Sequence, residues 1–135
     1  MEITISFPGG KKVNADVNGM VIPTDQPLTQ GGEGSAPSPY LLFLASIGTC
    51  AGIYVLSFCK ERGIPTDKIT LTQRLEYVTT PEGKSILDTI ALDIHVPPDF
   101  PEKYHNALIK VADQCAVKKT IMHPPKFAIK TVVRQ

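Results

Sequence analysis

Residues 1–21 alternate between apolar and polar positions. Ile3, Ile5 and Phe7 fall on one side of an extended chain, and Thr4 and Ser6 fall between them. A period of two residues is typical of a β-strand with one buried face. Turn-forming proline and glycine interrupt the pattern at residues 8–10. The segment therefore predicts two or three short strands.

Residues 23–39 lose this periodicity and are rich in Thr, Gln, Gly, Ser and Pro. Such a composition predicts a loop. Structureless segments of this length are uncommon in compact domains and are often functional. A plain connector between two elements is the alternative interpretation.

The uncharged segment Leu41–Cys59 predicts a long helix. Ser38 is a suitable N-cap, and Pro39 suits the first helical position, where its missing N–H costs nothing. A charged turn follows the segment, and Gly63 and Pro65 predict the helix end.

The length of this helix is near the lower limit for crossing a membrane. Its small and polar residues, among them Ser46 and Thr49, favour instead a helix surrounded by protein. Gly48 and Gly52 lie four residues apart and form a smooth stripe on one face. This stripe could receive a second, symmetry-related helix, or it could relieve crowding within one chain.

Beyond Pro65 the period of two returns, and it predicts an antiparallel hairpin over residues 67–97. Asp99 could cap a second helix whose apolar positions run at helical spacing to Cys115. Alternation over residues 127–133 predicts a last strand. Strands, helix, hairpin, helix and strand in this order define an α+β fold, and the chain length indicates a single domain over residues 1–135.

Composition narrows the classes of function. A net charge of +1, with 42% hydrophobic and 20% charged residues, is typical of a globular protein and offers no basic field for nucleic acid or an anionic membrane. No basic segment followed by an apolar stretch opens the chain, so we expect a cytoplasmic protein. In that reducing compartment we expect the 3 cysteines to be core residues, metal ligands or reactive thiols rather than a permanent disulfide framework.

The cysteines are candidates for thiol chemistry. Cys50 and Cys59 fall on opposite faces of the long helix and cannot pair with each other. Cys115 precedes Lys118 and Lys119, whose ammonium groups could lower the pKa of a nearby thiol. An isolated helical cysteine can equally be a small buried apolar residue.

No cofactor or metal is expected. His95, His105 and His123 are isolated in the sequence, and no Cys-x-x-Cys motif or closely spaced His pair accompanies them. The glycine pairs lack the neighbouring residues that phosphate-binding loops require.

Two segments resemble one known family. Residues 31–50, GGEGSAPSPYLLFLASIGTC, and residues 112–120, ADQCAVKKT, are similar to the OsmC/Ohr family of thiol-dependent hydroperoxide reductases. The predicted order of elements extends this resemblance over nearly the whole chain. The resemblance implies an OsmC-like fold with antiparallel sheets, a long buried central helix, a second helix that carries a cysteine, and an intertwined homodimer.

The resemblance also implies a chemistry. Cys50 would be the peroxidatic thiol that reduces a hydroperoxide, Cys115 would resolve the oxidised Cys50 as a disulfide, and a cellular dithiol would reduce that disulfide. We therefore expect a thiol-dependent peroxidase that acts in oxidative-stress defence.

The sequence departs from the family pattern at three places. Peroxidases of the family activate the first thiol with an Arg from the loop before the long helix, held by a Glu just after the Pro. Here Tyr40 follows Pro39, and residues 20–39 contain no Arg or Lys. Ala116 also replaces a Pro that is common after the second cysteine.

These departures leave two functions open. Arg74, Lys118 or Lys119 could supply the missing cation once the chain folds. Alternatively, the chain is a non-peroxidatic module on the same fold that binds a small apolar ligand or carries a thiol or sulfur group.

Overall fold

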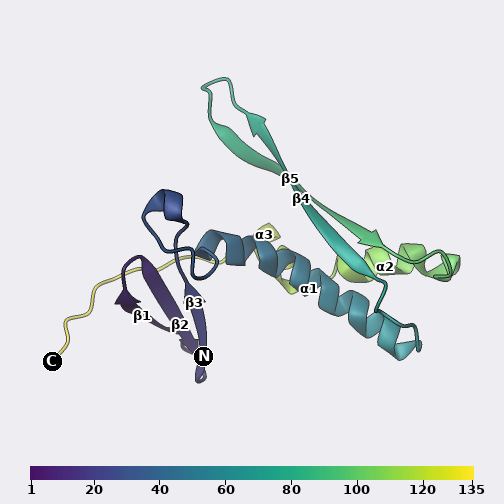
Figure 1. Ribbon diagram of the computed structural model, residues 1–135, viewed down its shortest axis with the longest axis horizontal. Coiled ribbons are helices and arrows are strands. Elements are labelled where there is room, and N and C mark those ends of the chain that lie inside the picture. Colours follow the sequence, from purple (N-terminus) through teal and green to yellow (C-terminus); the bar gives the residue numbers. More distant parts are fainter. The chain divides into compact units, whose positions relative to one another are not determined.

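The computed structural model describes residues 1–135 and contains both sheets and helices (Figure 1). In order along the chain, the elements are β1 (Thr4–Gly9), β2 (Lys12–Val17), β3 (Met20–Thr24), η1 (Leu28–Gln30), α1 (Pro39–Glu61), β4 (Thr70–Thr79), β5 (Ser85–His95), η2 (Glu102–Tyr104), α2 (His105–Ala112) and α3 (Ala116–Met122). The predicted α+β class is confirmed. The chain divides into two compact units, Met1–Ser46 and Ile47–Gln135, with α1 continuous through the boundary. The single domain therefore stays a prediction.

The first unit contains an antiparallel sheet of three strands in the order β1-β2-β3. Ile5 pairs with Ala15, and Ala15 pairs in turn with Ile22 on β3. The predicted strands are thus confirmed. Every residue of β1 is exposed, and Phe7 keeps 81% of its surface accessible, so the sheet lacks a covered apolar face within the described chain.

The loop after β3 is organised around the carboxylate of Asp25, whose side chain has no exposed surface. One carboxylate oxygen accepts a hydrogen bond from Gln26 N–H at 2.7 Å. The other accepts from the hydroxyl of Ser35 at 2.6 Å, from Ser35 N–H at 3.1 Å and from Glu33 N–H at 3.3 Å. The Ser35 hydroxyl, followed by the backbone N–H donors, lowers the pKa of Asp25 to about 2. The Asp25 carboxylate therefore fixes the loop together with backbone hydrogen bonds such as that from Gly34 N–H to Gln26 C=O.

Asp25 makes the stability of this loop dependent on pH. Since its pKa is lower in the folded protein than in the unfolded chain, ionised Asp25 stabilises the fold above pH 3.8, and this stabilisation is lost as the pH falls towards 2. We expect Asp25→Asn to lower the Tm by several degrees at neutral pH, and the difference from the native protein to shrink below pH 3.8. Thermal unfolding across this range checks the result, with Asp67→Asn as the exposed control. A Tm difference that is independent of pH contradicts it.

Helix α1 begins and ends where the sequence predicts. The Ser38 hydroxyl accepts a hydrogen bond from Leu41 N–H at 3.3 Å and caps the first turn. At the other end Gly63 has a φ of +64°, and hydrogen bonds join Gly63 N–H to Lys60 C=O and Ile64 N–H to Cys59 C=O. This pair of bonds closes the helix in a Schellman motif, which requires the left-handed conformation that glycine adopts without strain.

One face of α1 is buried, as predicted, at Leu44, Ile47, Ala51, Val55, Phe58 and Cys59. Other apolar residues, Leu41, Phe43 and Ile53, stay exposed. By length and composition α1 could cross a membrane, although core helices of soluble proteins also meet this criterion. The prediction of a fully surrounded helix therefore holds for one face of the helix.

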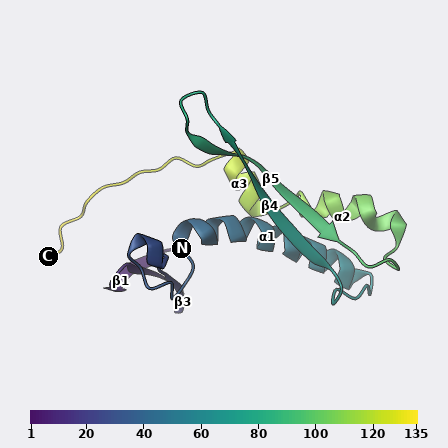
Figure 2. The same ribbon diagram turned by 45° about the horizontal axis from the view of Figure 1, so that its top comes forward.

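The second unit packs α1 against the β4–β5 hairpin and α2 (Figures 1 and 2). The hairpin is regular from Thr70, which pairs with His95, to Thr79, which pairs with Ser85, apart from one irregularity after Glu76. The core of the second unit consists of Val55, Phe58, Cys59, Phe100 and Leu108, and apolar residues of β4 and β5 pack against this cluster. The predicted hairpin is confirmed.

The hairpin explains why residue 48 is a glycine. A Cβ atom at this position would lie 2.6 Å from the side-chain oxygen of Gln73, which interrupts the apolar face of β4. No atom lies within 4 Å of the corresponding point at Gly52. Within this chain, Gly48 thus provides space for a polar side chain, and Gly52 faces open space.

Three predictions about the C-terminal third are wrong. The helix expected to run to Cys115 ends at Ala112, and a separate helix, α3, begins at Ala116. The predicted cap at Asp99 does not form, because α2 starts only at His105. Residues 124–135 form no strand, and Figure 2 shows them as an extended chain. Alternation produces a strand only where a neighbouring strand accepts its backbone hydrogen bonds, and this chain offers none there. Phe127 and Ile129 are consequently exposed.

Candidate thiol site

The fold brings Cys50 and Cys115 together from distant parts of the sequence. Cys50 lies in the middle of α1, and Cys115 lies in the break between α2 and α3. The two thiols lie close enough for each to shift the pKa of the other. Both cysteines are free thiols, as is Cys59.

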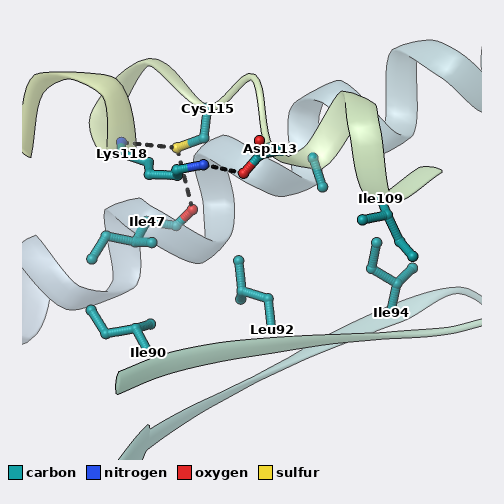
Figure 3. A pocket seen from close by; sticks show the side chains of 9 residues that line it. Ile47, Ile90, Leu92, Ile94, Ile109, Asp113, Cys115 and Lys118 are labelled. Carbon is teal, nitrogen blue, oxygen red and sulfur yellow. Dashed lines mark hydrogen bonds and ion pairs between the residues drawn. The ribbon is translucent and has the colours of Figure 1, made fainter. Parts of the chain in front are cut away.

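The backbone at Cys115 explains how the second thiol reaches the first. Its φ of −47° and ψ of 121° are not helical, so the chain turns at this residue and Cys115 becomes the N-cap of α3. Its sulfur accepts a hydrogen bond from Lys118 N–H at 3.3 Å and lies 3.7 Å from Ile47 C=O, to which the thiol can donate (Figure 3). With 1% of its surface exposed, the Cys115 side chain is held from several directions.

Backbone donors act on the sulfur of Cys50. The N–H group of Val117 makes the largest contribution to lowering the pKa of Cys50, and the Cys115 thiol and the N–H group of Ala116 act in the same direction. Burial opposes them, because it disfavours the charged thiolate. The net result is a Cys50 thiol that ionises more readily than an ordinary cysteine.

The second thiol is shifted in the opposite direction. Burial raises the pKa of Cys115, and the adjacent Cys50 sulfur adds to this effect, while the N–H groups of Lys118 and Val117 partly offset it. When one proton is removed from the pair, Cys50 therefore becomes the thiolate and Cys115 keeps its hydrogen as a donor. The different surroundings of the two cysteines thus favour a thiolate at Cys50 and a protonated thiol at Cys115.

The three candidate cations do not serve the thiols as ammonium or guanidinium groups. Arg74 pairs with Asp93 at 3.0 Å and with Glu76 on the exposed face of the hairpin. The Lys118 ammonium pairs with Asp113, and the Lys119 ammonium donates to Gln114 at 2.8 Å. The expectation that a lysine ammonium lowers the pKa of Cys115 is wrong, because only the backbone N–H of Lys118 reaches that sulfur.

A cavity of about 330 Å³ adjoins Cys115. Figure 3 shows how β5 forms one wall, with α1 and α2 supplying further apolar side chains. The lining is apolar at Ile47, Ile90, Leu92, Ile94, Ile109 and Ala112, and polar at the Asp113–Lys118 ion pair beside the Cys115 thiol. Such a space accommodates a small apolar molecule with its reactive end near sulfur.

The remaining candidates lie outside this site. Cys59 is fully buried in the core, and burial raises its pKa. His95 contacts Thr72 at 3.0 Å, His105 lies beside the ring of Phe100, and His123 ends α3. Cysteine, histidine and carboxylate side chains form no cluster that could hold a metal ion.

Sequence reasoning missed the donors and the cavity. The N–H groups of Ala116 and Val117 carry no side-chain signature, and Ile47 and Leu92 appear in the sequence as ordinary core residues. One signal was present, however, because Ala116, unlike a proline, has an N–H group to donate.

Fold and site together define an α+β protein with two adjacent thiols of unequal acidity. Residues 32–130 match the family model described as OsmC-like protein, and the chain belongs to this family. No curated protein sequence matches the chain.

Solved structures share the fold. A proposed osmotic stress induced and detoxification response protein from Psychrobacter arcticus 273-4 is 21% identical, with a TM-score of 0.70 over 90% of this chain and 88% of that one. An organic hydroperoxide resistance protein OsmC from Legionella pneumophila is 22% identical, with a TM-score of 0.57 over 90% and 89%. An OsmC-like protein from Mycoplasma pneumoniae is 17% identical, with a TM-score of 0.67 over 91% and 87%. At these identities the likeness establishes the fold.

Proposed function

We propose that this chain is a thiol-dependent peroxidase that reduces hydroperoxides in the cytoplasm. The observation that carries the proposal is the contact between Cys50 and Cys115, with the pKa lowered at the first thiol and raised at the second. Some proteins of similar fold are named for organic hydroperoxide resistance, which agrees with this chemistry.

The reaction begins at the Cys50 thiolate. The sulfur attacks the terminal oxygen of the hydroperoxide, the O–O bond breaks, and an S–O bond forms. The alkoxide leaves with the electron pair of the broken bond and takes a proton from solvent, so that a hydroperoxide becomes an alcohol and Cys50 becomes a sulfenic acid. The cavity beside Cys115 would hold the apolar part of the substrate.

Cys115 completes the cycle. Its thiol displaces the hydroxyl group of the sulfenic acid, which forms a Cys50–Cys115 disulfide and one water molecule. A cellular dithiol then reduces this disulfide by exchange and is itself oxidised to a disulfide. The proximity of the two thiols, each of which shifts the pKa of the other, supports this resolving step.

Mapping the thiols after oxidation tests the proposal. One equivalent of an organic hydroperoxide is added to reduced protein, and its peptides are analysed by mass spectrometry without reduction. We expect a rapid Cys50–Cys115 disulfide with Cys59 still reduced, since Cys59 is buried with a raised pKa. Thiols that all remain unreacted would contradict the proposal.

Thiols that remain unreacted would favour the alternative function, a module that binds a small ligand or carries sulfur. The apolar cavity beside a thiol is also what a small-ligand-binding or sulfur-carrying module would need. Native mass spectrometry of the protein distinguishes this alternative by a bound small molecule or a persulfide on Cys50 or Cys115.

The proposed active form is a homodimer. Apolar side chains stay exposed on α1, on β1 and β3, and in the extended segment 124–135, among them Phe43, Ile53, Phe7, Ile22 and Val133. A second copy would cover apolar surface of this kind, which single soluble chains rarely leave open. The solution mass, compared with the 14.7 kDa of one chain, tests this assembly.

A further inference from the structure

Two side-chain bridges join the chain before Cys115 to the chain after it. The Asp113 carboxylate pairs with the Lys118 ammonium (Figure 3), and the side-chain oxygen of Gln114 accepts a hydrogen bond from the Lys119 ammonium at 2.8 Å. Each bridge joins residues five positions apart, and each spans Cys115. We call these two bridges the clasps.

The clasps depend on the break between α2 and α3. In a continuous α-helix, residues five positions apart are separated by about 140° around the axis, so a helix through Cys115 would not bring these partners together. The ψ of 121° at Cys115 turns the chain and does so. The clasps therefore stabilise the broken chain relative to the continuous helix that the apolar periodicity through Cys115 favours.

The break also determines where the Cys115 thiol lies. Its sulfur is 3.7 Å from the C=O of Ile47 on α1, the helix that carries Cys50. A helical ψ at Cys115 would change the direction of the chain on one side of this residue relative to α1. The broken conformation thus keeps the second thiol against the helix of the first.

We propose that the residues of the clasps are positioning residues, which hold Cys115 where it can form a disulfide with Cys50. They act through Cys115 and take no part in making or breaking bonds. The proposal rests on the thiol pair of the proposed function, but the stability of this disulfide is measurable without any peroxide. In a glutathione buffer, glutathione disulfide oxidises the two thiols to a disulfide and is itself reduced to two molecules of glutathione.

Asp113→Ala combined with Gln114→Ala opens both clasps, and alanine at these positions also favours the continuous helix. The disulfide requires the break, whereas the reduced chain of this variant can leave it. We expect the equilibrium constant for the Cys50–Cys115 disulfide to fall about fivefold, a modest effect because both bridges are exposed. Mass spectrometry of alkylated peptides from graded glutathione buffers measures it. Lys110→Ala, exposed on α2 outside the clasps, is the control and should keep the native constant.

A charge exchange distinguishes positioning from a general loss of stability. Asp113→Lys alone places two ammonium groups together and should lower the constant. Adding Lys118→Asp restores the ion pair with its charges reversed, at helix ends that favour the new charges. We expect this exchange to recover the native constant. If the double alanine variant does not fold, the single and exchanged variants decide the question. Native constants in the folded variants that open a clasp, or no recovery in a folded exchange, would overturn the proposal.

The positioning proposal and the peroxidase function fail separately. If the native protein consumes no hydroperoxide, yet opening the clasps weakens the disulfide and the exchange restores it, the peroxidase function is wrong and the positioning role stands. If the native protein is an active peroxidase and the clasp variants keep its disulfide constant, the positioning role is wrong and the peroxidase function stands.

Discussion

Replacing Cys50 with serine is expected to reduce hydroperoxide consumption by more than about a thousandfold. A serine hydroxyl is not ionised near neutral pH, and its oxygen cannot be oxidised by a peroxide as sulfur can. The backbone donors of Ala116 and Val117 remain in Cys50→Ser, so the loss isolates the contribution of the thiolate itself. The rate of peroxide disappearance with a dithiol reductant measures it.

Cys59→Ala is the matched control for this experiment. Cys59 lies on the same helix, but it is fully buried among Phe58 and Leu108, and burial raises its pKa. We expect Cys59→Ala to keep the native rate of peroxide reduction. Full activity in Cys50→Ser, or loss of activity in folded Cys59→Ala, would show that the reactive thiol has been misassigned.

Local signals made part of this fold predictable. The bounds of α1 follow from Ser38, Pro39 and Gly63, because capping depends on residues within one turn of the helix end. The hairpin follows from alternation on either side of a turn, which is also a local pattern. Both elements therefore appear in the structure close to their predicted limits.

The break at Cys115 could not be predicted in this way. Apolar residues continue at helical spacing through Leu108, Val111 and Ala112 to Cys115, and no glycine or proline interrupts them. The non-helical ψ of Cys115 accompanies contacts of its sulfur with Ile47 and Lys118, and the contact with Ile47 joins distant parts of the sequence. Tertiary contacts of this kind override helical periodicity.

The groups that lower the pKa of Cys50 could not be predicted from the sequence for a related reason. A search for a cation considers side chains, and it led to Arg74, Lys118 and Lys119. The groups that reach Cys50 are peptide N–H groups, which every residue except proline carries. Their position depends on the start of α3, and this start depends on the break at Cys115.

At the C-terminus, local reasoning predicted an element that does not form. Residues 127–133 carry a strand pattern that local reasoning finds, but a strand also needs a partner for its backbone groups. Neither the three-stranded sheet nor the β4–β5 hairpin provides one within this chain. The exposed Phe127 and Ile129 fit the proposed homodimer, in which a second copy would supply the missing partner.

Replacing Cys115 with serine is expected to stop the cycle after its first step. The Cys50 thiolate still receives hydrogen bonds from Ala116 and Val117, so the first oxidation should proceed within a few-fold of the native rate. Serine is a good N-cap and can accept the Lys118 N–H as the Cys115 sulfur does, so α3 should be retained. Without a second thiol, however, no internal disulfide can form.

The expected product of Cys115→Ser is therefore a long-lived sulfenic acid on Cys50. A cyclic 1,3-diketone should trap it as a covalent adduct that mass spectrometry assigns to Cys50, and excess hydroperoxide should carry it on to the sulfinic acid. Steady-state turnover with a dithiol should fall at least about tenfold, because the reductant must now attack a sulfenic acid in a half-buried position instead of a disulfide. Native turnover in Cys115→Ser, with no trapped adduct, would assign resolution directly to the external dithiol and leave Cys115 as the cap of α3.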